Sequence, residues 1–172
     1  ALPISENAGI VAEYAEQAFL TSGKSINEYY NSVSQITASL KRSVGDDMEE
    51  VARVADIAMQ AISDNVNTFG SDAEFVENAI MGLSRNNYTM IDNLKLGYAG
   101  SAQGMMELIN DSGILGKKLT DTSQLAEVGF DKMILAIQKG QEEQGIAGTT
   151  AKEALHTIEG AGKATKSAWQ NV

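Results

Sequence analysis

Apolar residues recur every three or four positions along most of this sequence, which is the spacing of residues on one face of an α-helix. Up to residue 84 the pattern predicts four helices: Ser5 to Gly23, Ser25 to Gly45, Asp46 to Gly70, and Ser71 to Leu83. Each begins at a residue type that caps helix N-termini, and the first three end at glycine, which readily takes the left-handed conformation found after helices. Because the connections are short, successive helices must turn back on one another, and we predict a bundle.

Three of these N-termini share the capping-box pattern, in which Ser or Asp is followed three positions later by Glu. The pattern occurs at Ser25-Ile26-Asn27-Glu28, Asp46-Asp47-Met48-Glu49 and Ser71-Asp72-Ala73-Glu74. We therefore expect the first residue of each to be the N-cap. The apolar stripes that follow place Phe69 and Phe75 among the residues that face the core.

The second half of the chain is less regular. We predict a short helix from Ala102 to Asp111, a linker or long loop over 112–122, a helix over 123–144, and a last helix from Thr150 onward. No useful stretch alternates as a β-strand does. The expected fold is all-α, with six to eight short antiparallel helices, glycine-capped turns and no sheet. Residues 1–111 would form the helical bundle, and the two helices within 123–172 would pack on it.

The net charge of −10 limits the classes of partner. The acidic excess lies before Gly116, and from there onward acidic and basic residues balance. No basic patch is evident, so we expect no tight nucleic-acid binding and interpret the acidic half as a solvated surface. No apolar run is long enough to predict a membrane segment. The sequence contains no cysteine, which excludes disulfides and thiolate metal sites.

Few residues are candidates for catalysis or metal binding. His156 is the only histidine, so neither an HExxH zinc site nor a Ser-His-Asp triad can be built. The acidic cluster at Asp46-Asp47-Met48-Glu49-Glu50 lacks the twelve-residue spacing of a calcium loop, and early-turn acids that complement the helix dipole explain it. We predict that the chain is not an enzyme and binds no metal or cofactor.

Two glycine-rich stretches raise the possibility of an anion site. Gly97, Gly100 and Gly104 precede a predicted helix, but the strand and the lysine–threonine step of a phosphate loop are missing. The stretch from Gly145 to Thr150 could hold an anion at a helix N-terminus, and a plain turn between helices is the alternative that we favour. Methionines form a further cluster in sequence, which we interpret as core residues in preference to a partner-binding surface; they are Met81, Met90, Met105 and Met106.

The stretch "RNNYTMIDNLKLGYAGS", at 85–101, is the most specific in the chain. Its physical interpretation is a helix exit, a short capped turn from Thr89 to Leu96, and a glycine hinge before the next helix. Tyr88 and Tyr98 would pin this turn onto neighbouring helices. Residues 86–101 also resemble, almost residue for residue, a segment of the tail tape measure proteins of long-tailed bacteriophages and prophages, with departures at Ile91 and Ala99.

The resemblance extends in the same order to "SINEYYNSVSQITASL" at 25–40, "VARVADIAMQAISDNVNTFG" at 51–70 and "GIAGTTAKEALHTIEG" at 145–160. It is weakest over 112–128. The residues that carry the family motif are Asn87, Tyr88, Thr89, Met90, Asp92, Asn93, Leu94, Lys95, Leu96, Gly97 and Tyr98, together with Gly148, Thr149 and Thr150.

The resemblance implies a structural role in virion assembly. Tape measure proteins are long helical chains around which the tail tube polymerises, and their length sets the length of the tail. The implied partners are tail-assembly chaperones, tail-tube and tail-tip proteins, and further copies of the chain in the tail. The implied locations are the virion tail and, during assembly, the bacterial cytoplasm. We expect the chain to be an internal fragment of such a protein.

An alternative stays open at this point. A host-encoded helical module that binds a protein partner through its acidic surface would share the composition and the caps. The position of its coding region would separate the two, because only a tape measure gene is expected between the genes for the tail tube and the tail tip.

Overall fold

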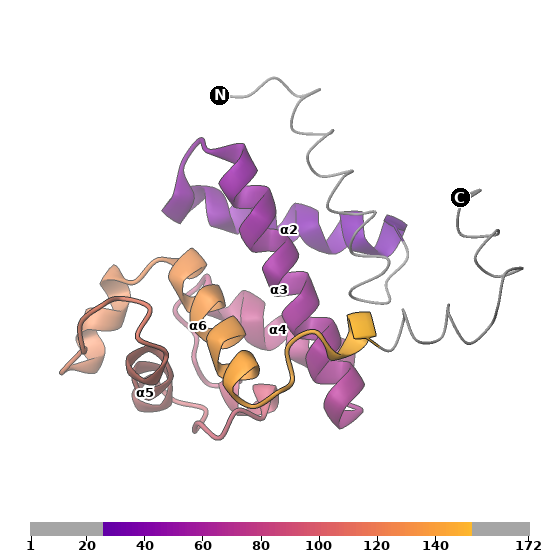
Figure 1. The fold of residues 1–172 in the computed structure, drawn as a ribbon. Coiled ribbons are helices and arrows are strands. Elements are labelled where there is room, and N and C mark those ends of the chain that lie inside the picture. The colour runs from indigo at the N-terminus through magenta and orange to yellow at the C-terminus, as the bar shows by residue number, and fades with distance from the viewer. Residues whose placement is uncertain (1–25, 153–172) are drawn as a thin grey trace, which may run out of the picture.

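The structure is a computed structural model, and it describes residues 26–152 (Figure 1). Besides a helical segment at 149–152, these residues form five α-helices and two 3-10 helices, with no strand among them. They are α2 (Ile26–Val44), α3 (Met48–Phe69), α4 (Ala73–Leu83), η1 (Ile91–Leu94), α5 (Ala102–Ser112), η2 (Thr122–Glu127) and α6 (Phe130–Glu143). The predicted all-α bundle is confirmed for this part of the chain. The helix predicted over 5–23 and most of the last helix lie outside the described residues.

The longest helix, α3, is the centre of the bundle. It packs against α2, α4 and α6, as Figure 1 shows. It is therefore buried on several faces, and its buried residues include the polar run Ser63-Asp64-Asn65 near its C-terminal end. A helix enclosed in this way is expected to be apolar on most of its surface, so a polar run inside it needs partners. One hydrophobic core extends from Val33 to Ile146, and α6 belongs to it.

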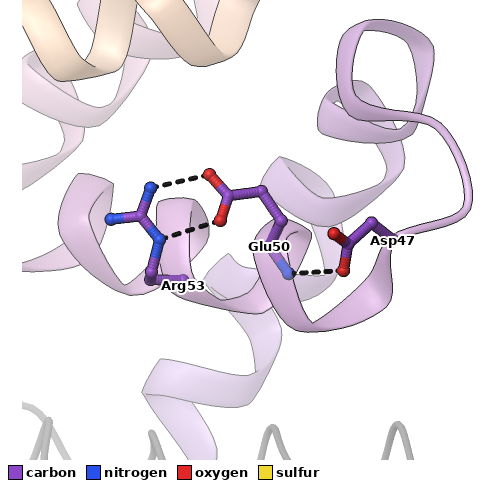
Figure 2. A network of polar contacts seen from close by, with 3 residues as sticks. All are labelled: Asp47, Glu50 and Arg53. Atoms are coloured by element: carbon purple, nitrogen blue, oxygen red, sulfur yellow. Dashed lines mark hydrogen bonds and ion pairs between the residues drawn. The ribbon is translucent and has the colours of Figure 1, made fainter.

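The N-caps of α3 and α4 lie one residue later than the capping-box pattern predicted, and Ser25, the third predicted cap, lies outside the described residues. Asp47, and not Asp46, caps α3, and its Oδ1 accepts from the Glu50 backbone N–H at 3.2 Å (Figure 2). Glu50 is engaged by Arg53 through bonds of 2.6 and 2.9 Å. These bonds lower the pKa of Glu50, partly opposed by burial and reinforced by the charges of Arg53 and Lys132.

The start of α4 shows the same shift. Asp72 is its N-cap, and its carboxylate accepts from the Glu74 backbone N–H at 2.8 Å. Ser71, the predicted cap, keeps a buried hydroxyl oxygen without a hydrogen-bond partner. In both turns two cap-forming residues are adjacent, and the aspartate nearer the helix is the one that caps it.

Phe75 does not face the core, contrary to the prediction. Its side chain is 63% exposed, whereas the neighbouring Val76 is fully buried. Val76, Ala79, Ile80 and Leu83 already form a complete stripe at the i, i+3, i+4, i+7 positions, and Phe75 lies beside that stripe. Phe69, at the end of α3, is also 38% exposed.

The helix predicted over 123–144 is interrupted. Val128 is extended, with φ −87° and ψ 123°, and it separates η2 from α6. Gly129 follows it as the N-cap of α6, where a β-carbon would lie 3.0 Å from the Ser43 Cβ of α2. The break thus allows the start of α6 to approach the end of α2 closely.

No helix forms between α5 and η2. Asn110, near the end of α5, fixes this segment by donating from Nδ2 to the Leu119 carbonyl at 3.0 Å and accepting from the Leu119 N–H at 2.8 Å. Leu119 is buried. These contacts attach the loop to the core.

Candidate functional site

The motif stretch begins with a tight exit from α4. The Asn87 N–H donates to the Gly82 carbonyl at 2.9 Å, while Asn86 takes a left-handed backbone with φ 58°. Asn87 Oδ1 then accepts from the Thr89 N–H at 3.1 Å and from the Thr89 hydroxyl at 2.6 Å, which is an Asx turn. The turn leads into η1, which lies within the predicted turn from Thr89 to Leu96. The predicted cap is wrong, because Met90 is the N-cap of η1 and no side chain caps it.

The motif residues divide between the core and the surface. Leu94 and Leu96 are buried, and the other members contacting the core are half-buried: Tyr88, Met90 and Tyr98. The members at the surface are Asn87, Thr89, Asp92, Lys95 and Gly97, and Asn93 is half-buried. Met105 and Met106 are also buried, in agreement with their interpretation as core residues.

The glycines after the motif serve close backbone packing. A β-carbon at Gly100 would collide with the Thr89 carbonyl oxygen, and one at Gly104 would collide with the Ala99 carbonyl oxygen. Gly97 has φ 93°, a conformation that favours glycine. The spacing that suggested a phosphate loop is therefore explained by packing between the turn and α5.

Tyr98 is held by a carboxylate at the far end of α5. Its hydroxyl donates to Asp111 Oδ2 at 2.5 Å. Burial and this hydrogen bond raise the pKa of Tyr98 to about 12, and nearby acidic charges contribute to the shift. Burial alone raises the pKa of Tyr88. Both rings pack against the core, and Tyr98 also binds α5; these contacts are compatible with the predicted pinning of the turn.

Side-chain amides connect the motif to α3 and to the end of α6. Asn65 of α3 is fully buried, and its Nδ2 donates to the Leu94 carbonyl at 2.6 Å. Gln144, which follows α6, donates from Nε2 to the Leu96 carbonyl at 2.9 Å. The two carbonyls on either side of Lys95 are therefore both bound by side-chain amides from distant parts of the chain.

The Gly145–Thr150 turn holds an anion, and that anion is the carboxylate of Asp64. The Gly148 N–H donates to Asp64 Oδ2 at 2.8 Å, and the Thr150 N–H donates to Asp64 Oδ1 at 3.0 Å. Asp64 is only 3% exposed. Residues 149–152 are helical, so Asp64 caps the start of that helix from another element. In Figure 1 this segment, drawn in yellow-orange, lies beside α3.

Together these contacts form one polar site, which we call the α3 junction: Asp64 and Asn65 of α3, Gln141 and Gln144, and the backbone groups that they bind. Gln141 completes it, because its buried Nε2 donates to the Ala61 carbonyl at 2.9 Å. The junction brings Leu94, Leu96, Gly148 and Thr150 of the predicted set to one place. Thr149 lies at its edge, with its hydroxyl 3.4 Å from that of Thr68.

The sequence prediction missed the four side chains that build the junction. The available signal was the polar pair Asp64-Asn65 within a helix that is otherwise rich in apolar residues. Among residues 26–152, no group of three or more acidic or histidine side chains is arranged to hold a metal ion. In the same range, no helix combines the length and apolarity that spanning a membrane requires.

Comparisons with known proteins identify no relative. No family model, no curated protein and no solved structure matches the chain.

Proposed function

We propose that this chain is a helical module of a phage tail tape measure protein, with a structural role in tail assembly and no catalytic one. The proposal starts from the resemblance of residues 86–101 to that family. A structural role also agrees with the chemistry of the site, since the side chains of the α3 junction bind backbone groups of the chain itself.

One observation carries the proposal beyond a match of letters. Three of the four stretches that resemble the family, 51–70, 86–101 and 145–160, contribute residues to the α3 junction, the last of them through Gly148 and Thr150. Residues 26–40 of the fourth stretch lie in α2, which packs on α3. Chance resemblances scattered along a chain have no reason to occupy one contact network, so their convergence supports a shared folding unit.

The proposed module is compact, so it would add less to the length of the tail than a straight helix of the same number of residues. A straight helix of 172 residues would extend roughly 260 Å, whereas a compact chain of that size has a radius of gyration of about 16 Å. We propose that the module is a folded body within a longer ruler, formed in the bacterial cytoplasm and carried into the virion tail. Tail-assembly chaperones, tail-tube and tail-tip proteins are its proposed partners. Small-angle scattering should give a radius near the compact value, and one several times larger would contradict the module.

The function is tested by deleting the codons for these residues, in frame, from the phage or prophage that encodes them, followed by electron microscopy of the particles. We expect tails to be missing, or altered in length, with heads unaffected. Restoring the codons in trans should restore the tails. Normal tails in the deletion strain would contradict the proposal and favour the host-encoded binding module.

A further inference from the structure

A cavity of about 590 Å³ opens between the end of α2, the loop before η2 and the start of α6. Its volume falls within the range of ligand-binding clefts. Leu115, Leu119 and Val128 supply apolar lining, and three cations border it: Arg42, Lys117 and Lys132. The cations come from three separate elements, so their convergence was invisible in the sequence.

The charge of this cavity contrasts with the rest of the protein. Three cations line it in a chain of net charge −10, together with the carboxylates of Glu127 and Asp131. Among the described residues, none of the three cations lies within ion-pair distance of a carboxylate. The three cations and two carboxylates give the lining a net charge of +1, and the cations are available to an acidic partner.

An acidic turn lies next to this cavity. Asp46, Asp47 and Glu49 are exposed where α2 turns into α3, at the upper left of Figure 1, only a few residues after Ser43 of the cavity wall. Asp47 caps α3, and Glu50 is engaged by Arg53 (Figure 2). Among the described residues, the carboxylates of Asp46 and Glu49 have no hydrogen bond or ion pair, so they can pair with cations of another molecule.

We propose that the acidic turn at residues 46–49 of one copy docks into the cation-lined cavity of a second copy, and that the second copy does the same in return. A two-fold interface requires a surface that is complementary to itself. A negative turn beside a positive cavity meets this requirement, because one rotation places each turn against the other copy's cavity. Opposed charges at both contacts also fix the orientation of the two copies.

This inference does not rest on the proposed function. The cavity residues and the acidic turn at 46–49 lie outside the four stretches that resemble the tape measure family. If the phage assignment failed, the charges and the cavity would still predict the dimer. If the protein proved monomeric, the phage assignment would still stand.

The first experiment is sedimentation velocity on the full chain over a range of concentrations. Wild type should show a monomer–dimer equilibrium. The cavity variant R42E/K117E should raise the dimer dissociation constant at least about tenfold. The control variant K41E/K118E makes the same change in net charge at the adjacent residues, which do not line the cavity, and should stay within about twofold of wild type. Circular dichroism should confirm that all variants have equal helix content. If a charge-reversed variant does not fold, the neutral variants R42Q/K117Q and K41Q/K118Q replace R42E/K117E and K41E/K118E.

The second experiment mixes two variants that should each be monomeric. D46K/E49K has a positive turn and a positive cavity, and R42E/K117E has a negative turn and a negative cavity. Together they should form a heterodimer, because both contacts then join opposite charges. Any of three results would overturn the proposal. They are a wild type that remains monomeric up to about 1 mM, a control variant as damaging as the cavity variant, and a mixture that does not associate.

Discussion

Asp64 and Thr150 lie 86 positions apart in the sequence, and the backbone N–H of Thr150 donates to Asp64 Oδ1 at 3.0 Å. The second carboxylate oxygen accepts from Gly148, so one buried side chain satisfies two N–H groups at the start of a helix. An N-cap normally comes from the residue next to its helix. Here it comes from α3, and the contact connects the end of the described chain to its centre.

Replacing Asp64 with alanine should destabilise the fold markedly. Two N–H groups would lose their acceptor, at a cost of about 1–3 kcal/mol for each that stays buried. The control is Asp72→Ala, which removes an exposed N-cap from α4 and should cost about 1 kcal/mol. Urea unfolding followed by circular dichroism measures both, and equal losses would show that Asp64 is an ordinary cap.

Replacing Asn65 with leucine should also lower the free energy of unfolding, although the side chains are similar in size. The buried Leu94 carbonyl would lose its side-chain donor, at a cost of about 1–3 kcal/mol. Asn67→Leu, at an exposed position of the same helix, should change stability by no more than about 0.5 kcal/mol. A stable Asn65→Leu protein would mean that this hydrogen bond does not hold the motif.

The double substitution of Tyr88 and Tyr98 by alanine should loosen the bundle. Both rings are half-buried against the core, so we expect a loss of roughly 3 kcal/mol in total, about half the cost of truncating two fully buried rings. Thermal unfolding monitored at 222 nm provides the measurement. If the double variant melts like the wild type, the tyrosines do not pin the turn.

Stability should fall at high pH because of Tyr98. The folded state holds the protonated phenol, with a pKa of about 12, above the ordinary value of 10.0. Its contribution is therefore complete below pH 10 and is lost as the pH rises through 12. Absorbance at 295 nm should show one tyrosine that ionises near pH 12, and Tyr98→Phe should remove that component. A titration unchanged by Tyr98→Phe would contradict the assignment.

Gly104→Ala should reverse the usual effect of alanine in a helix. Alanine normally stabilises a helix interior by roughly 0.5–1 kcal/mol relative to glycine. In α5 the added methyl group would collide with the Ala99 carbonyl oxygen, which belongs to the backbone and cannot rotate away. We therefore expect a lower midpoint in urea, and a higher one would show that the motif stretch shifts freely away from α5.

The sequence was sufficient for the elements governed by local chemistry. Gly70 and Gly113 take the left-handed conformation at the ends of α3 and α5, close to where the periodic pattern stopped. Ser71 and Asp72 are adjacent and both are good capping residues, so the pattern located this N-cap only to within one residue.

The junction could not be predicted in the same way. Gln141 binds the carbonyl of Ala61, and no local pattern encodes a contact over such a separation. The break at Val128 is also invisible locally, because an apolar residue fits the helical pattern there and the approach of Gly129 to Ser43 joins distant segments. The sequence did identify the motif residues whose backbone groups the junction side chains bind. They are Leu94, Leu96, Gly148 and Thr150.

The long separation between Asp64 and its partners has a consequence for synthesis. A ribosome that adds about 5–20 residues per second needs roughly 4–17 s to pass from Asp64 to Gly148, which lies 84 positions later. Throughout that interval the Asp64 carboxylate and the Asn65 amide lie on α3 while some of the backbone groups that they bind have not yet been synthesised. We expect the emerging chain to remain open along this side of α3, accessible to other molecules in the cell, until its last described segment arrives and closes it.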